Sequence, residues 1–294
     1  MAWRQLVLQT QYPDFGEEIL EAQGALAVSM KPTEDVDPIL EPGPGATPLW
    51  PRVCLEGLFP DDSDLAPVYR ALEELLPDAA QMRAEEMLVP DTDWVRNCLD
   101  NMGSMRFGQR LWVAPHHREV DAPGAVVIKL DPGLAFGTGT HPTTDLCLQW
   151  LDGASLQGQR VLDFGCGSGI LAVAALRLGA REAVAVDNDA QAIVATRENA
   201  VNNDVDAMLH CMLDTEFDGD GDFDIVLANI LAEPLIALAP TLLAQLKPGG
   251  SVVLAGLLDR QAERVEAAYP GIAWTRESLE GWTRLAGRSM TSQH

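Results

Sequence analysis

The chain has 294 residues, 47% of them hydrophobic, which is enough for two globular domains with sizeable cores. Its 44 acidic and 20 basic residues give a formal net charge of −24. This charge repels a phosphate backbone, so nucleic acid is not an expected partner. A basic protein partner, or a surface that is acidic for solubility alone, is compatible with the charge. The five cysteines and five histidines lack disulfide or metal-ligand spacing, and the chain shows no signal peptide or bilayer-length apolar run, so we expect a cytoplasmic protein without a metal centre.

The first 90 residues show strand and helix patterns in the order βαββαβ. Alternating apolar residues predict strands at residues 3–9, 25–30, 53–59 and 84–89. Helical spacing predicts one helix over 12–22 and a second that starts near Ser63 or Asp64 and carries Leu65, Val68 and Leu72. This order is the one that a ferredoxin-like sandwich needs, with two helices on one face of an antiparallel sheet.

A break at Pro90 marks the expected domain boundary. Residues 91–102 read as a connecting helix, so we expect a domain over 1–90, a connecting helix and linker over 91–106, and a larger domain over 107–294. In the larger domain, strands are expected at 110–114 and 125–130 and a helix over 143–151, followed by alternating strands and helices. That alternation predicts an α/β fold with a parallel, doubly wound sheet.

A glycine loop follows the apolar strand in Val161–Ile170. Gly165, Gly167 and Gly169 have the spacing G-x-G-x-G, whereas a dinucleotide-binding loop of the Rossmann type requires G-x-G-x-x-G. Ile170 stands where the third glycine of that motif would be. The loop therefore brings backbone to a ligand that need not carry phosphate, and S-adenosylmethionine is such a ligand.

The next predicted strand ends in an acid, in Ala183–Asp187. A carboxylate at the carboxyl end of a second parallel strand can accept both hydroxyls of a ribose and would repel a 2′-phosphate. Alternatively, Asp187 caps the next helix, a role for which Asn188 and Asp189 are equally suited. The glycine loop at the right distance favours the ligand interpretation.

A third candidate segment is the loop of residues 130–144. Its glycines allow close backbone approach, its threonines, Thr144 among them, supply hydroxyls, and Phe136 adds an aromatic ring. The alternative is an ordinary capped helix start with Pro142 in the first turn. His141 is a conceivable base, although a lone histidine beside a proline is more often structural.

The fourth segment is Phe223–Ala232, a buried strand that ends in Asn229. A polar amide at the end of an apolar strand is costly unless it is paired, and a substrate amine is a natural partner that it could orient toward a methyl donor. As an alternative, Asn229 is a turn former before Glu233 and Pro234. The acid-rich loop of residues 214–224 offers one carboxylate for an adenine amino group, and its other acids are expected to be solvated.

Together these segments resemble the bacterial ribosomal protein L-eleven methyltransferases over essentially the whole chain. The most specific parts are residues 130–144, 163–169 and 228–231. The resemblance implies a class I methyltransferase Rossmann-like domain and a protein N-methyltransferase that uses S-adenosyl-L-methionine to methylate lysine ε-amines and the N-terminal α-amine of ribosomal protein L-eleven. It further implies that the N-terminal domain recognises that substrate. We expect the enzyme to act as a monomer.

Six residues are candidates for the site. The resemblance implies contacts to S-adenosylmethionine by four of them, and the two glycine-containing loops add Gly167 and Phe136. Asn229 would also orient the acceptor amine. The cofactor-binding set is Phe136, Thr144, Gly165, Gly167, Asp187 and Asn229.

Three other functions remain open from the sequence. Methyltransferases of planar nitrogens have Asn-Pro-Pro-aromatic at this strand end, whereas Ile230 and Leu231 follow Asn229 here, so no stacking ring is provided. A dinucleotide-dependent oxidoreductase and a non-catalytic ribosome-assembly factor are the other two alternatives.

Overall fold

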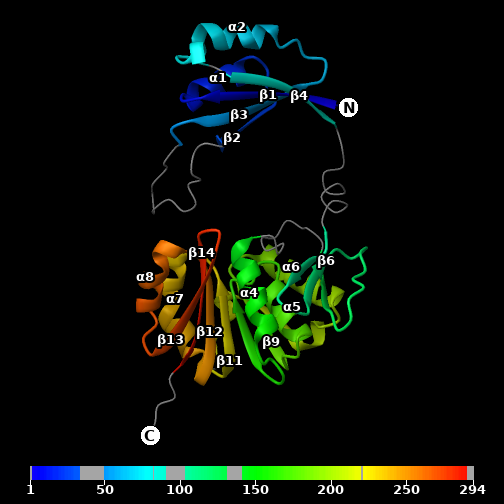
Figure 1. The fold of residues 1–294 in the computed structure, drawn as a ribbon, viewed down its shortest axis with the longest axis vertical. Helices are drawn as coiled ribbons and strands as arrows, with labels where there is room; N and C mark the ends of the chain where they lie inside the picture. The colour runs from blue at the N-terminus through cyan, green and yellow to red at the C-terminus, as the bar shows by residue number, and fades with distance from the viewer. Residues whose placement is uncertain are drawn as a thin grey trace. The chain divides into compact units, whose positions relative to one another are not determined.

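The computed structural model describes residues 2–33, 50–81, 83–90, 103–130, 141–219 and 221–289 (Figure 1). The chain forms two compact units, residues 1–94 and 95–294. The predicted connecting helix over 91–102 and most of the predicted loop over 130–144, including Phe136, lie outside the described residues.

The N-terminal unit has the predicted βαββαβ order. Its elements are β1 (Ala2–Thr10), α1 (Pro13–Ala22), β2 (Ala27–Pro32), β3 (Val53–Pro60), α2 (Ala66–Leu75), the 3-10 turn η1 (Ala79–Gln81) and β4 (Arg83–Pro90). The sheet order is β2-β3-β1-β4, and each strand pairs antiparallel with its neighbours. This confirms the ferredoxin-like expectation.

The core of this unit lies on one face of the sheet. Because successive side chains of a strand alternate between faces, Leu6 and Leu8 of β1 point the same way and are fully buried. They pack with Ile19 and Leu20 of α1 and with Leu72 of α2. The two helices therefore cover one face of the four-stranded sheet.

The C-terminal unit contains the remaining elements. They are β5 (Met105–Phe107), β6 (Leu111–Ala114), β7 (Val126–Lys129), α4 (Pro142–Gly153), β8 (Arg160–Phe164), α5 (Ile170–Arg177), β9 (Glu182–Asp187), α6 (Ala190–Asn202), η2 (Asp206–Met208), β10 (Leu209–Leu213), η3 (Asp214–Glu216), β11 (Phe223–Asn229), α7 (Ala232–Ala244), β12 (Leu246–Leu258), η4 (Asp259–Gln261), α8 (Ala262–Ala267), β13 (Ile272–Leu279) and β14 (Trp282–Ser289).

The main sheet has the strand order β10-β9-β8-β11-β12-β14-β13. The first five strands in that order pair in parallel, as predicted, but β14 runs antiparallel to both β12 and β13. The predicted doubly wound α/β fold is therefore confirmed, and the sheet departs from parallel pairing only at this edge. Glu280 and Gly281, with φ of 53° and 81°, form the two-residue turn that joins β13 to β14, which suits a turn of the type I′ kind.

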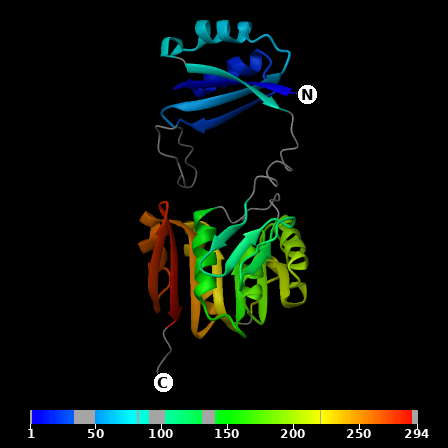
Figure 2. The same cartoon turned by 45° about the vertical axis from the view of Figure 1, so that its right-hand side comes forward.

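Helices cover both faces of this sheet (Figures 1 and 2). Buried residues of α4, α5 and α6 share one apolar core with the sheet, and those of α7 and α8 share a second core on the other face. All residues from Ile170 to Leu176 are buried, because α5 packs on the sheet and between its neighbouring helices. Among the described residues, no helix is long and apolar enough to cross a membrane.

Two expectations about local structure need correction. The strands expected near 110–114 and 125–130 exist as β6 and β7, but they form a separate three-stranded sheet with β5, a strand that was not predicted. The sequence Lys-Pro-Gly-Gly at residues 247–250 is typical of a sharp turn, but these residues lie within the irregular start of β12.

Candidate functional site

The site candidates gather where β8, β9 and β11 end. The chain leaves β8 to build β9 and β10 on one side, then returns to build β11 on the other side. Ligands of open α/β sheets bind at such a switch point, outside the carboxyl ends of the strands. All five predicted site residues that the structure describes lie at this edge: Thr144, Gly165, Gly167, Asp187 and Asn229.

The glycine loop after β8 follows a path that requires glycine. Gly165, Gly167 and Gly169 have φ of 78°, 55° and 75°, in the left-handed region that side chains disfavour. The Gly165 amide donates to the Val186 carbonyl at 2.7 Å, which ties the loop to the end of β9. A β-carbon on Gly169 would lie 2.5 Å from Thr196 Cγ2, so this glycine also lets the loop pack closely against α6.

Asp187 contacts the glycine loop directly. Its Oδ2 accepts a hydrogen bond from the Gly167 amide at 2.9 Å, and its Oδ1 accepts one from the Asp189 amide at 3.0 Å. The residue that caps α6 is Asp189, whose carboxylate accepts from the Gln191 amide at 2.8 Å. The alternative that Asp187 caps this helix is therefore wrong, and its carboxylate stands beside the loop where a ribose diol would be held.

Thr144 and Asn229 meet across the same edge. Thr144 is buried in the first turn of α4, and its Oγ1 accepts from Asn229 Nδ2 at 3.4 Å. Because the amide donates through Nδ2, its Oδ1 is the atom that can accept a hydrogen from an amine. The Thr144 hydroxyl oxygen and the Asn229 amide oxygen are therefore two acceptors, next to the glycine loop, for the hydrogens of an ammonium or amine group.

His141 has a structural role. It is the N-cap of α4, with Nδ1 2.8 Å from Thr143 Oγ1 and 3.3 Å from the Thr143 amide, and its ring packs edge-on against Trp282 at 4.8 Å between centroids. Burial lowers the pKa of this imidazole, so the neutral ring that can accept these hydrogen bonds is favoured. The structural interpretation of His141 is supported over a role as base.

Asp163 is a buried acid behind the glycine loop, and its local sequence pattern predicts no individual role for it. Its side chain is almost wholly buried, and Oδ2 accepts from the Ala172 amide in the first turn of α5 at 3.1 Å. Oδ1 is also buried and has no hydrogen-bond partner among the residues that the structure describes. Burial raises the pKa of this carboxyl to about 7, the bond from Ala172 opposes that shift, and the nearby charge of Asp187 adds to it.

The two acids fit a cationic ligand. S-adenosylmethionine carries a sulfonium and an ammonium, and a positive ligand at this edge would relieve the repulsion between Asp163 and Asp187. Asp187, Thr144 and Asn229 carry oxygen atoms at this edge that can accept hydrogen bonds from hydroxyl and amine groups. No cluster of ligating side chains that could hold a metal occurs in the part of the chain that the structure describes.

The acid-rich loop divides between the two edges of the sheet. Asp214 begins η3 at the carboxyl end of β10, and its side chain is exposed, as expected for a solvated turn. Asp222 and Asp224 lie at the opposite edge, where both pair with Lys247, at 3.5 and 3.1 Å. Of these three acids, Asp214 is therefore the one on the edge where an adenine amino group would lie.

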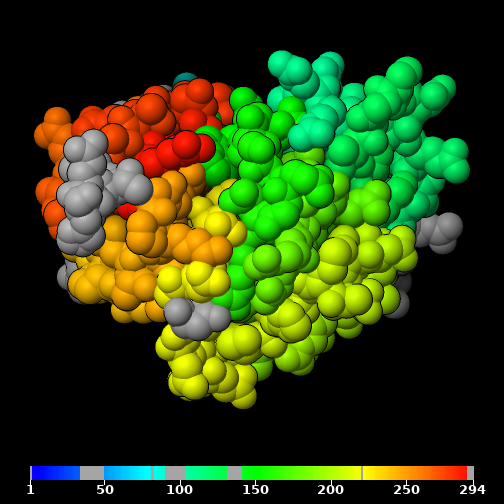
Figure 3. Space-filling model, turned by 90° about the horizontal axis from the view of Figure 1, so that it is seen from below, coloured from blue at the N-terminus to red at the C-terminus, as the bar shows by residue number. Residues whose placement is uncertain are grey.

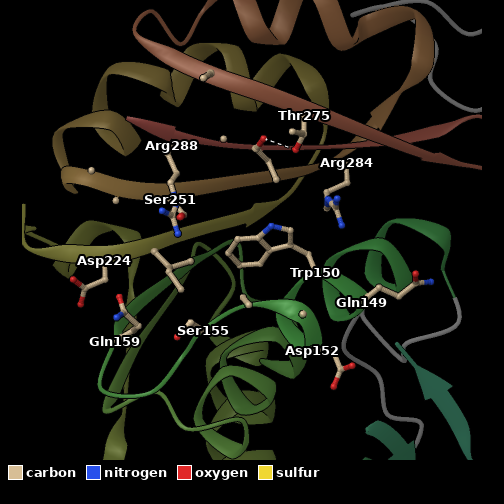
Figure 4. Close-up of a pocket in the computed structure, with 18 of the residues that line it drawn as sticks. Gln149, Trp150, Asp152, Ser155, Gln159, Asp224, Ser251, Thr275, Arg284 and Arg288 are labelled. Carbon is tan, nitrogen blue, oxygen red and sulfur yellow. Dashed lines mark hydrogen bonds between the residues drawn. The ribbon is translucent and has the colours of Figure 1, made fainter. Parts of the chain in front are cut away.

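A large pocket of about 1280 Å³ lies away from these residues. It is formed by the end of α4 and the amino-terminal parts of β11 and β12 together with β13 and β14. Figure 3 shows this end of the unit, and Figure 4 shows Trp150 pointing across the pocket toward the strands that carry Ser251, Arg284 and Arg288. Because it is at the amino ends of the strands, this pocket is not the nucleoside site.

Known proteins of one family match this chain over nearly its full length. The family described as Ribosomal protein L11 methyltransferase matches residues 2–290. Proteins named "Ribosomal protein L11 methyltransferase" from Chromohalobacter salexigens and Serratia proteamaculans are each 46% identical, over 98% of this chain and 99% of their own. A solved structure titled as a ribosomal protein L11 methylase, from Lactobacillus delbrueckii subsp. bulgaricus, is 32% identical with a TM-score of 0.58 and covers 64% of this chain and 100% of its own.

These matches agree with the sheet described above. Its strand order, with an antiparallel strand inserted next to the last one, is that of the class I methyltransferases, and this fold implies S-adenosylmethionine as the methyl donor. The chain belongs to the ribosomal protein L11 methyltransferase family.

Proposed function

We propose that this protein methylates amines of ribosomal protein L11, namely lysine ε-amines and the N-terminal α-amine, in the cytoplasm. Thr144, Gly165, Gly167, Asp187 and Asn229 would bind S-adenosylmethionine, with Phe136 as a further contact. Asp187 would accept the ribose hydroxyls, and Asn229 would also orient the acceptor. The relatives named as ribosomal protein L11 methyltransferases support L11 as the substrate, and the arrangement of these side chains supports an amine acceptor.

The observation that carries the proposal is the hydrogen bond between Asn229 and Thr144 beside the glycine loop. It fixes an amide oxygen as an acceptor at the end of β11, where an amine could donate to it. The residues that follow, Ile230 and Leu231, are aliphatic, so a planar base or amide would find no aromatic ring to stack on. Leu231 is 51% exposed and offers an apolar surface to the methylene chain of a lysine.

The acceptor must be a neutral amine when it reacts. A lysine with an ordinary pKa near 10.4 costs roughly 4 to 5 kcal/mol to deprotonate at pH 7. The donor supplies an activated methyl group on a sulfonium, whose positive charge, together with partial burial, lowers that amine pKa. Asn229 would then align the lone pair, and the proton would leave to water, so no side chain needs to act as a strong base.

The N-terminal domain would recognise the substrate. We place this domain at residues 1–90, the connecting segment at 91–106 and the catalytic domain at 107–294. The two helices of this unit cover one face of its sheet. No helix among the described residues of the unit covers the other face, which includes Trp3, Val7, Leu58 and Met87. This unit contains many more acidic than basic residues, which favours a basic protein partner.

A methylation assay tests the proposal. The purified enzyme is incubated with ribosomal protein L11 and isotope-labelled S-adenosylmethionine, and the modified residues are mapped by mass spectrometry. Label on lysine and terminal amines is the expected result. Label on glutamine, or on nucleic acid in a parallel reaction, would overturn the amine assignment, and cofactor binding without transfer would favour an assembly factor.

A truncation tests the role assigned to the first domain. Deleting residues 1–90 should leave binding of S-adenosylhomocysteine intact and abolish methylation of L11. A truncated enzyme that methylates L11 as fast as the full chain would show that recognition lies elsewhere.

A further inference from the structure

Ile230 connects the glycine loop to the strand that carries Asn229. It is the residue directly after Asn229, and its side chain lies against Gly165. A β-carbon built on Gly165 would come 2.3 Å from Ile230 Cγ2 but 3.8 Å from Ile230 Cβ. The methyl group on the branched β-carbon of Ile230 therefore occupies the space that any side chain at position 165 would need.

A second glycine, Gly256, lies close to the backbone of Ile230. Gly256 has φ of 87°, and a β-carbon there would lie 2.3 Å from the Ile230 carbonyl oxygen and 3.0 Å from its amide nitrogen. Gly256 lies where the pairing of β12 with β14 shifts register, between Leu254 and Leu257. The irregular segment of β12 thus lets the chain after Asn229 approach closely.

We propose that Ile230 is a positioning residue that sets the distance between the acceptor-orienting amide of Asn229 and the glycine loop of the methyl donor. The inference rests on the proposed function, in which Asn229 orients the amine. The backbone of Ile230 packs closely against Gly256, and the Cγ2 methyl of Ile230 lies against Gly165. Both contacts lie within the protein, so in this proposal Ile230 acts through Asn229 and Gly165.

The shape of the side chain is what this role requires. Valine keeps the branch at the β-carbon, with a methyl in the place of the one that touches Gly165, and is smaller than isoleucine by one methylene. Leucine has the same atoms as isoleucine, yet it has no methyl on its β-carbon. If Ile230 only filled apolar space, activity would survive replacement by leucine better than replacement by valine. If Ile230 sets the distance between Asn229 and Gly165, activity should survive replacement by valine and not by leucine.

The test compares Ile230→Val with Ile230→Leu in the full-length enzyme. We expect Ile230→Val to retain the wild-type kcat and Ile230→Leu to lose about 10- to 100-fold in kcat, since a misplacement of about 1 Å can cost that much. The KM for L11 and the Kd for S-adenosylhomocysteine should change little in both variants. Loss in Ile230→Val with retention in Ile230→Leu would overturn the proposal.

Two glycine-to-alanine variants, one at a contact with Ile230 and one away from it, test the role of Gly256. Gly256→Ala and Gly271→Ala both place alanine at a positive φ, 87° and 80°, but nothing lies within 4 Å of a β-carbon at Gly271. Gly271→Ala should therefore keep full activity, whereas Gly256→Ala should lower kcat because it moves the backbone of Ile230. Equal kcat values in these two variants would contradict the role of the Gly256 contact.

A structural readout separates this proposal from the proposed function. Crystal structures of the variants with S-adenosylhomocysteine should show Asn229 displaced relative to Gly165 in Ile230→Leu but not in Ile230→Val. If the wild-type enzyme methylates no amine, the proposed function fails, and the position of Asn229 still decides whether Ile230 is a spacer. An unmoved Asn229 in Ile230→Leu would refute that role.

Discussion

Replacing Asp163 by asparagine should change how the stability of the protein depends on pH. Asparagine has nearly the same shape, and its Oδ1 can still accept the hydrogen bond from the Ala172 amide. It cannot ionise, however, so the substitution removes a buried charge that the wild-type fold must accommodate at neutral pH. The substitution therefore isolates the cost of ionising Asp163 behind the glycine loop.

The magnitude follows from the shifted pKa of Asp163. Burial raises that pKa from 3.8 to about 7, so the folded state holds its proton more tightly than the unfolded state does. The stabilisation by the protonated form is complete below the unfolded pKa and is lost as pH rises through the folded pKa. At about 1.36 kcal/mol per pH unit the whole effect is about 4 kcal/mol, of which roughly 3 kcal/mol falls between pH 5 and pH 8.

Urea unfolding at several pH values measures this effect. The free energy of unfolding of Asp163→Asn minus that of the wild type should rise by about 3 kcal/mol from pH 5 to pH 8, and contributions from groups that the substitution leaves alone cancel in the difference. Asp218→Asn, on an exposed loop, removes the same formal charge without burial and serves as the control. Parallel pH profiles for Asp163→Asn and the wild type would refute the reasoning.

Three further predictions concern the site and the core. Asp187→Ala should weaken binding of S-adenosylhomocysteine by about 10- to 100-fold in calorimetry, because hydrogen bonds to charged groups contribute roughly 1.5 to 3 kcal/mol, and unchanged affinity would exclude Asp187 from the ribose site. Asn229→Ala should lower the rate of methyl transfer far more than cofactor affinity, whereas equal losses in rate and affinity would argue against a role in orienting the acceptor. Tyr269→Phe should destabilise the fold by about 1 kcal/mol in urea unfolding, because the buried hydroxyl donates to the Leu235 carbonyl at 2.7 Å, and a neutral effect would show that this bond adds no net stability.

Local patterns were enough to predict most of the elements that build the site. Alternation marked β1 through residues such as Leu6 and Leu8, and an apolar strand that runs into glycines marked β8 and its loop. These signals lie within a few residues of one another, so they can be read without knowledge of distant contacts. The short strand Met105–Phe107 was missed because three residues carry no detectable alternation.

Contacts between distant residues could not be predicted from the sequence. Asp187 and Asp189 are both good capping residues, and only the position of the glycine loop distinguishes the one that faces it. Thr144 and Asn229 are 85 residues apart, and nothing local pairs them. The closeness of Gly256 to Ile230 likewise depends on the irregular pairing of β12, for which the sequence signal is a single glycine in an apolar strand.

The antiparallel strand β14 bears on the order in which the large unit is assembled during synthesis. Since β14 lies between β12 and β13, the interior strand β12 keeps one row of unpaired amides and carbonyls until Trp282–Ser289 has been made. An open, apolar edge of this kind pairs readily with other chains. The nascent protein would therefore be most prone to aggregate after β12 emerges from the ribosome and before β14 follows it, and shielding by chaperones would matter most in that interval.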